Sequence, residues 1–313
     1  MKYLVCFSLV FLCGYNSISQ YIPQNGVKES QSDVTVITNA HIYVSSSLEY
    51  ERACMIIQHG QVVKIGKKLK IPKGAIVIDM KGRTILPAFI ELNSRIGIPE
   101  EKKKEARSFS PQMESSKTDS YYWNEAIHPE INSSELYQKN LKELKLLNEK
   151  GFGFVVSHNS DGIARGSGVL VSAHGEELSK DILIPEVASF YSLNKGSSRQ
   201  TYPSSQMGSI ALLRQSLYDY RYYLESERCF TDLSMESWEK QMELTKFMET
   251  KDKWEILRAA RIGKEFGFDF IYFGSGNEYE CANSLKDLDA KIILPINFPK
   301  AFDVSDLIIQ SFK

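Results

Sequence analysis

Histidine is scarce in this 313-residue chain, which contains only His41, His59, His128, His158 and His174. There is no C-x-x-C pair, so a thiolate zinc site is not expected, and the H-x-x-E-H and H-E-x-x-H patterns are also missing. Neither sign of charge dominates, because 38 Lys and Arg stand against 39 Asp and Glu. Without a basic surplus the chain has no electrostatic footprint for nucleic acid.

Long apolar runs are also missing. The run at residues 3–13 is too short for the ~20 residues that span a bilayer. It follows Lys2 and precedes a small-x-small site at 17–19, which predicts a signal peptide over 1–19, cleaved near Ser19 and Gln20. A secreted or periplasmic protein without a transmembrane segment after signal removal is therefore expected. A buried N-terminal strand, an uncleaved anchor and a lipoprotein are the alternatives.

Cysteine is too sparse for a disulfide framework. Two of the five cysteines lie in the predicted signal peptide, which leaves Cys54, Cys229 and Cys281, widely spaced. Three buried thiols are the favoured reading, and one bridge with a free thiol is the alternative.

A polar tail at 20–33 precedes a region rich in short β-forming runs. These runs are separated by turn signals at 59–60, 72–74 and 81–82, as expected for successive short strands. They predict a small β-sandwich-like module over 34–85, with strands at 34–37, 41–44, 53–58, 62–65 and 75–78.

Strands and helices alternate from residue 84 onward. The run at 84–93 (TILPAFIELN) has the pattern of a strand buried on both faces of a parallel sheet. Expected helices lie at 134–150, 205–225, 237–248, 253–266, 285–288 and 303–312, and expected strands at 152–158, 168–173, 268–273 and 291–296. Such alternation gives a parallel sheet with crossover helices. A closed (β/α) barrel needs ~250 residues. The fold class predicted is therefore α/β, with a partial, TIM-like (β/α) barrel over 86–313 that is open or incomplete.

Three segments in register carry a family resemblance. They are 37–42 (ITNAHI), 55–66 (MIIQHGQVVKIG) and 77–87 (VIDMKGRTILP). Together they resemble the N-terminal part of the amidohydrolase superfamily, in particular its imidazolonepropionase-like members. The resemblance implies a metal-dependent hydrolase of non-peptide C–N bonds such as cyclic amides, with zinc or another divalent metal as cofactor.

The next residues depart from that pattern. The family continues P-G-F-I-D-x-H-x-H-x-G, whereas residues 87–97 read PAFIELNSRIG, so Asn93 and Arg95 take the positions of the two metal-binding histidines. Residues two apart on a strand face the same way, which is how H-x-H aims two imidazoles at one metal. Asparagine is a poor zinc ligand and arginine a fixed cation. No metal and no cofactor are therefore expected in this chain.

Candidate site residues remain at the expected barrel mouth. His158 ends a predicted strand and could form an acid–base pair with Asp161, or it could cap a turn there. Arg95 could bind a carboxylate, or it could form a salt bridge with Glu91 or Glu100. The segment 165–168 (RGSG) could cradle an anion through its backbone N–H groups, although a hairpin turn is favoured. The aromatic run 121–123 could stack a ligand or anchor a long loop over about 98–133.

The downstream segments 122–127, 161–168 and 202–210 resemble long, secreted amidohydrolase-like proteins. In that branch a degenerate N-terminal unit precedes a unit that keeps its metal ligands. The favoured prediction is a non-catalytic unit that works with such a downstream or partner unit. One alternative is a hydrolase that is active only when joined to that unit. The other is a secreted protein that binds a small molecule without chemistry.

Overall fold

The computed structural model describes residues 34–100, 111–174, 181–226, 228 and 230–295. The chain divides into two compact units, Met1–Pro87 and Ala88–Lys313. The predicted signal peptide, the polar tail, Cys229 and the helix expected at 303–312 lie outside the described residues. Cys54 and Cys281 are free thiols. No described helix has the length and apolar character needed to cross a membrane.

The first unit contains a five-stranded sheet. Its strands are β1 (Val34–Tyr43), β2 (Glu49–Gln58), β3 (Gln61–Gly66), β4 (Ile76–Asp79) and β5 (Thr84–Ile85), in the order β3-β2-β1-β4 with β5 beside β1. His59 and Gly60 both have positive φ, 50° and 75°. Two such residues form the tight turn whose twist suits a hairpin, here between β2 and β3. Ala40, Ile42, Ala53 and Met55 form the buried core of the unit.

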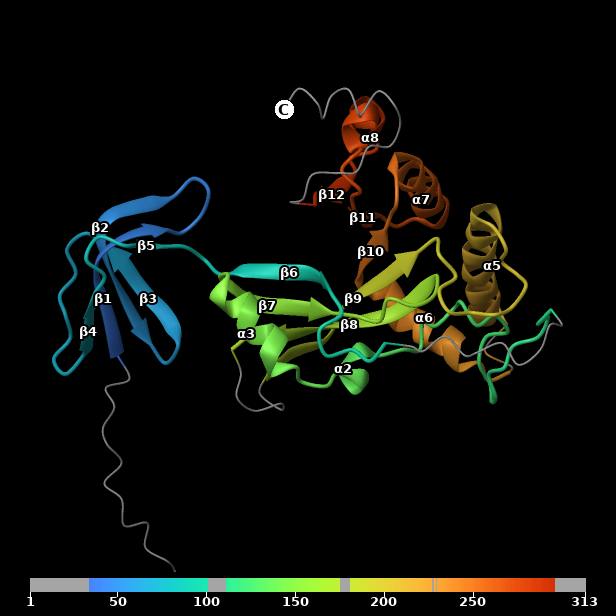
Figure 1. Ribbon diagram of the computed structural model, residues 1–313, viewed down its shortest axis with the longest axis horizontal. Helices are drawn as coiled ribbons and strands as arrows, with labels where there is room; N and C mark the ends of the chain where they lie inside the picture. The colour runs from blue at the N-terminus through green and yellow to red at the C-terminus, as the bar shows by residue number, and fades with distance from the viewer. Residues whose placement is uncertain (1–33, 101–110, 175–180, 227, 229, 296–313) are drawn as a thin grey trace, which may run out of the picture. The chain divides into compact units, whose positions relative to one another are not determined.

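A seven-stranded sheet organises the second unit (Figure 1). Its strands are β6 (Phe89–Ser94), β7 (Phe152–Ser157), β8 (Ala164–Ser172), β9 (Ile182–Ser192), β10 (Thr245–Glu249), β11 (Phe270–Phe273) and β12 (Lys291–Ile293), adjacent in chain order. Only β8 runs antiparallel to its neighbours. Within the described residues β6 and β12 are the two ends of the sheet. The chain therefore has the predicted α/β fold, with a TIM-like barrel that is not closed.

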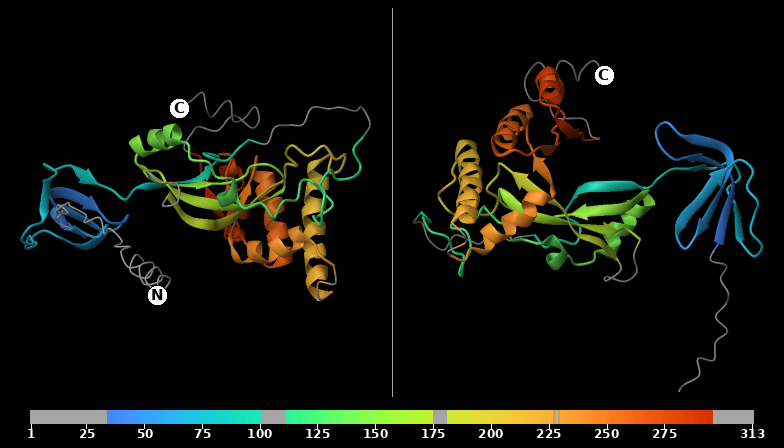
Figure 2. Two further views of the ribbon diagram at one scale, coloured as in Figure 1. Left: turned by 90° about the horizontal axis from the view of Figure 1, so that it is seen from below. Right: turned by 180° about the vertical axis from the view of Figure 1, so that it is seen from behind.

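Helices cover the outer face of this sheet (Figure 2). They are α2 (Ser133–Leu136), α3 (Leu141–Glu149), α5 (Gln206–Glu225), α6 (Leu233–Glu243), α7 (Lys253–Phe266) and α8 (Ala282–Asp287), with a 3₁₀ turn, η1, at Glu278–Cys281. The side chains of Asp232 and Asp252 cap the first turns of α6 and α7, and Gly267 ends α7 in the left-handed conformation. The largest buried cluster joins α5, α6, α7 and α8 to β9, β10 and β11, with Trp238, Leu212, Ile256 and Tyr191 in it.

The inner face of the sheet carries stacked aromatic rings. Phe190 on β9, Phe247 on β10 and Phe273 on β11 lie nearly parallel, with neighbouring ring centroids 5.3–5.4 Å apart. They belong to a separate buried cluster with Val156 and Ala188. Because alternate residues of a strand face opposite ways, the neighbours Tyr191 and Met248 join the outer cluster instead. The three stacked rings form a packed layer on the inner face of the sheet, below the carboxyl ends of the strands.

Several expected boundaries were wrong. The run at 84–93 divides at Pro87 into β5 and β6, and Phe89 and Ile90 are 57% and 50% exposed because β6 ends the sheet. The helix expected at 134–150 divides into α2 and α3, because Asn140 begins a new helix.

Two strands of the sheet were also missed. The helix expected at 237–248 ends at Glu243, and the next residues form β10, since the apolar pair Phe247 and Met248 is buried on both faces of the sheet. β9 was not predicted because polar residues and Pro185 interrupt its apolar pattern.

Candidate functional site at the carboxyl ends of the strands

The carboxyl ends of β6, β7, β9 and β10 meet at one edge of the sheet, because these strands run in the same direction. β8 runs the other way and begins at this edge, which brings Arg165 there. A cavity of about 340 Å³ opens here, lined by Arg95, Glu100, His158–Asp161 and the loop after β9. In a parallel α/β sheet this edge is where ligands bind.

His158 directly follows β7 and is 2% exposed. Its Nε2 lies 2.9 Å from Oδ1 of Asn93 on β6, and its Nδ1 lies 2.7 Å from the backbone oxygen of Asn159. The imidazole also stacks on the Phe190 ring, with centroids 3.8 Å apart and planes 7° from parallel. Contacts on both nitrogens and on one ring face fix the orientation of this side chain.

Burial lowers the pKa of His158 to about 4, and the positive charges of Arg165 and Arg95 act in the same direction. The ring is therefore neutral near pH 7. A carbonyl oxygen can only accept, so Nδ1 carries the hydrogen and Nε2 has to accept. The Asn93 amide supplies a donor to Nε2 by presenting its NH₂ group, since rotation interchanges the two ends of an amide. His158 is thus a satisfied neutral side chain.

Asp161 does not contact His158. Its two carboxylate oxygens accept hydrogen bonds from the backbone N–H of Ser197, at 2.6 Å, and from the Ser197 hydroxyl, at 2.7 Å. The Asp161 N–H donates to Asn159 Oδ1 at 3.1 Å, which closes a turn after β7. The structure therefore does not assemble the acid–base pair, and Asp161 ties the loop after β9 to the loop after β7.

Arg95 follows the last residue of β6, and its side chain is exposed in the cavity wall. No ion pair to Glu91 or Glu100 is found among the described residues; Glu91 instead accepts a hydrogen bond from the backbone N–H of Asn93, at 3.0 Å. Arg95 therefore does not form the salt bridge that was one of its two readings from the sequence.

Arg165 is the buried cation of the site, at 4% exposure. It donates from Nε to the Gly162 oxygen at 3.1 Å and from a terminal nitrogen to Oε2 of Glu249 at 2.5 Å. Burial works against the charge on Glu249, but Arg165 outweighs it and keeps the pKa of that carboxyl below its usual range. Sequence reasoning missed Glu249, because 84 residues separate it from Arg165.

The segment 165–168 lies within β8, so it is neither a hairpin turn nor an anion cradle. Ser167 is bridged to Asn132, and the Ser167 N–H donates to the Ile131 oxygen at 2.9 Å. Gly166 has φ +78°, and a Cβ there would lie 1.9 Å from that same oxygen. Glycine is required because the chain at 126–132 packs directly against this strand.

The residues at this edge do not fit a catalytic metal. Of the two side chains that replace H-x-H, Asn93 is engaged by His158, and Arg95 carries a fixed positive charge that would repel a metal ion. Among the described residues there is also no group of three His, Cys, Asp or Glu side chains placed to hold an ion.

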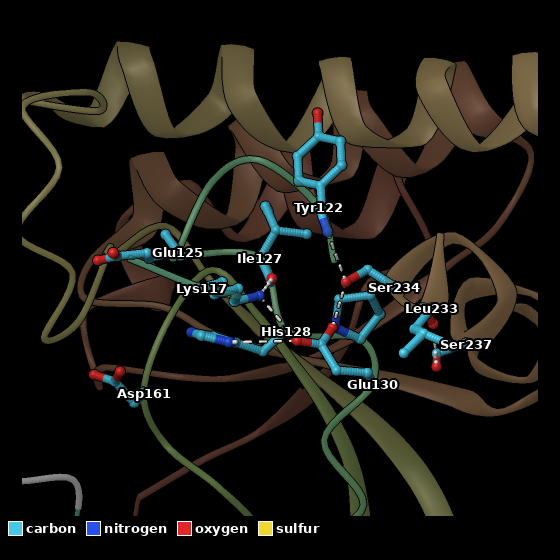
Figure 3. A network of polar contacts seen from close by, with 12 residues as sticks. Lys117, Tyr122, Glu125, Ile127, His128, Glu130, Asp161, Leu233, Ser234 and Ser237 are labelled. Atoms are coloured by element: carbon cyan, nitrogen blue, oxygen red, sulfur yellow. Dashed lines mark hydrogen bonds and ion pairs between the residues drawn. The ribbon is translucent and has the colours of Figure 1, made fainter. Parts of the chain in front are cut away.

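A second charged cluster lies in the segment that precedes α2 (Figure 3). Glu130 accepts from Lys117 Nζ at 2.9 Å and from the Ser234 hydroxyl at 2.8 Å, and His128 is 3.8 Å away. Burial opposes ionisation, yet the neighbouring His128 and Lys117 lower the pKa of Glu130 to about 2. All these groups are satisfied, and Asp161 lies apart from them. The cluster fastens the long segment to α6.

The aromatic run is an anchor as well. Tyr122 is 3% exposed and donates its hydroxyl to Asp219 on α5 at 2.6 Å, and its N–H to Ser234 at 3.1 Å. Trp123 stacks on Tyr202, with centroids 6.2 Å apart. The run holds the loop to α5 and α6, in line with the loop-anchor reading of the sequence.

Comparison with solved structures identifies proteins of similar fold. An amidohydrolase from Thermotoga maritima MSB8 is similar with a TM-score of 0.67 at 19% identity, over 86% of this chain and 72% of that one. A dihydroorotase from Methanosarcina mazei is 42% identical over 57 residues, which are 18% of this chain and only 12% of the dihydroorotase. No family model matches the chain.

The chain therefore has the fold of an amidohydrolase, with an open sheet in the part that the structure describes. The match to the dihydroorotase and the similarity to the Thermotoga structure together support a relationship to the amidohydrolase superfamily.

Proposed function

We propose that this chain is a metal-free, amidohydrolase-like unit that has no C–N hydrolase activity of its own and serves a catalytic unit as scaffold or ligand-binding half. The contact of 2.9 Å between His158 Nε2 and Asn93 Oδ1 carries the proposal. This contact pairs His158, the one histidine at the strand ends, with Asn93, which takes the position of a metal-binding histidine. Arg95 adds a permanent cation beside it.

A zinc titration of the purified chain tests this. We expect no tight binding near pH 7, because no three His, Cys, Asp or Glu side chains among the described residues are placed to hold an ion. One tightly bound equivalent, lost in His158→Ala, would refute the proposal. The double variant Asn93→His with Arg95→His is the matched control, since it restores H-x-H next to His158 and should bind zinc if the strand geometry is intact.

The proposed setting is a secreted or periplasmic protein, supported by the signal-peptide pattern of residues 1–19. N-terminal sequencing of the protein from its source cells tests this setting, and a chain that begins at Gln20 is the expected result. An intact Met1 in the cell interior would contradict it.

A second candidate is a hydrolase that becomes active when joined to a downstream or partner amidohydrolase unit. The coverage supports it, because this chain matches only 72% of the Thermotoga structure, and because the sheet ends at β6 and β12 within the residues that the structure describes. Expression together with any adjoining coding sequence, followed by assays on cyclic amides and dipeptides, tests it. An inert long form across that panel would contradict this candidate and leave the first one standing.

A further inference from the structure

The charged groups around the cavity at the strand ends are not equally available. Arg165 and Glu249 form an ion pair, and both oxygens of Asp161 accept from Ser197. His158 is neutral and has partners on both nitrogens. Arg95 alone of the cations in this wall has neither an ion pair nor a hydrogen bond to the side chains that the structure describes. Its guanidinium is therefore available to a ligand.

The same wall holds a hydrogen-bond donor without a partner. Asn159 is 4% exposed and lines the cavity. Its Oδ1 accepts from the Asp161 N–H, but its Nδ2 is buried without a hydrogen-bond partner. A buried donor left unpaired costs free energy, so such a group is a feature that needs an explanation. Arg95 and Asn159 thus provide two hydrogen-bond donors in this wall that have no partner among the described side chains.

We propose that the cavity binds a small monocarboxylate, held by Arg95 with Asn159 behind it. A carboxylate suits the planar fork of a guanidinium, which can donate two parallel hydrogen bonds to it. The volume of about 340 Å³ lies at the lower end of the range for small-molecule sites. The proposal deepens the function proposed above and rests on it, because a metal in place of Arg95 would give a different site.

The remaining charges select against a more highly charged anion. Glu100 and Asp161 also line the cavity, and each carries a negative charge. A phosphate dianion would meet this repulsion twice over, whereas a carboxylate meets it once. The site should therefore prefer acetate to inorganic phosphate.

Titration of the full chain with sodium acetate at constant ionic strength tests the site, followed through the ¹⁵Nε–Hε resonance of Arg95. We expect a saturable shift with a Kd of about 1 mM, which is weak binding on the scale of protein–ligand affinities. Inorganic phosphate should bind at least threefold more weakly. No saturable shift with acetate, or tighter binding of phosphate, would overturn the proposal.

Substitutions of two exposed residues in the cavity wall complete the test. Acetate binding to each variant is measured by saturation-transfer NMR. Arg95→Gln should weaken acetate binding at least tenfold, whereas Glu100→Gln, its matched control, should keep or strengthen it. Equal loss in both variants would overturn the proposal. A failure here is distinguishable from a failure of the proposed function, because the zinc titration needs no carboxylate.

Discussion

The His158 ring and the Asn93 amide are joined across adjacent strands, with Nε2 and Oδ1 2.9 Å apart. Each side chain leaves its strand at the carboxyl end, so the contact links β6 to β7 at the rim of the cavity. Protonation would place a positive charge on a side chain that is only 2% exposed and lies near the positive charges of Arg165 and Arg95. The pair therefore makes this edge of the sheet sensitive to acid.

We expect His158 to weaken the fold as the pH falls from about 6.5 to about 4. Its pKa is near 6.5 when unfolded and about 4 when folded, so the unfolded chain binds more protons in this window. The stability contributed by the neutral ring is full above pH 6.5 and lost toward pH 4. The full shift corresponds to roughly 3 kcal/mol. Urea unfolding at pH 7 and pH 5 measures the trend.

His158→Gln is the control for that pH dependence, because glutamine can hydrogen-bond but does not titrate here. The variant should be less stable at pH 7 and should lose a smaller part of its stability on going to pH 5. An equal loss in the native chain and in the variant would show that His158 does not titrate as expected.

Replacing Arg165 and replacing Glu249 should lower the free energy of unfolding by different amounts, although the two residues form one ion pair. Glu249→Gln leaves a buried guanidinium without its counter-charge, which we expect to cost about 3 kcal/mol. Arg165→Met leaves a carboxylate whose side chain is 39% exposed and can be hydrated, so the cost should be smaller. Chemical denaturation of both single variants and of the double variant gives the coupling between the two residues.

Arg228 and Glu239 provide the matched surface pair, with side chains 46% and 53% exposed and a distance of 2.7 Å. Glu239→Gln should change the free energy of unfolding by less than about 1 kcal/mol. If Glu249→Gln costs no more than this surface substitution, burial does not govern the Arg165 pair.

How much of the fold and of the site could be predicted from the sequence depends on how far apart in the chain the interacting residues lie. The turn at His59 and Gly60 and the cap at Gly267 are local, and the sequence indicated both. The replacement of H-x-H by Asn93 and Arg95 was readable for the same reason. The partners of these residues were not, because β10 brings Glu249 to Arg165 only after the sheet has formed.

The misread strands have a similar cause. An apolar run of five residues such as β10 has no periodicity that separates it from the end of a helix. Thr245–Glu249 forms a strand because it pairs with β9 on one side and with β11 on the other. Likewise sequence proximity left an Asp161–His158 pair open as one of two readings, whereas Ser197, 36 residues further on, provides the hydrogen bonds of Asp161.

Asp161→Ala should loosen the loop after β9. Both hydrogen bonds to Ser197 disappear, and hydrogen bonds to charged groups contribute about 1.5–3 kcal/mol each in measured series. We expect a loss of about 3 kcal/mol or more and faster hydrogen exchange of the backbone amides at 196–198. Asp161→Asn is the control, since one amide oxygen can still accept from the Ser197 N–H. Unchanged exchange in Asp161→Ala would contradict the assigned role.

Gly166 provides the sharpest test of how β8 is packed. In Gly166→Ala the new Cβ would lie 1.9 Å from the Ile131 oxygen and 3.1 Å from the His128 oxygen. Both are backbone atoms, and Ile131 is held by its own bond to Ser167, so neither can move aside cheaply. The residue also has φ +78°, where a side chain is strained by about 1 kcal/mol. We expect more than about 4 kcal/mol of destabilisation or no folded protein.

Gly60→Ala separates the clash from the backbone strain. Gly60 has nearly the same φ, +75°, but nothing lies within 4 Å of its added Cβ. Only the strain of about 1 kcal/mol should remain, and thermal unfolding should show a well-folded variant. If the two alanine variants lose the same stability, the chain at 126–132 does not press on β8. If only Gly166→Ala fails to fold, that close approach is what requires glycine at the start of the strand and fixes Arg165 beside Glu249.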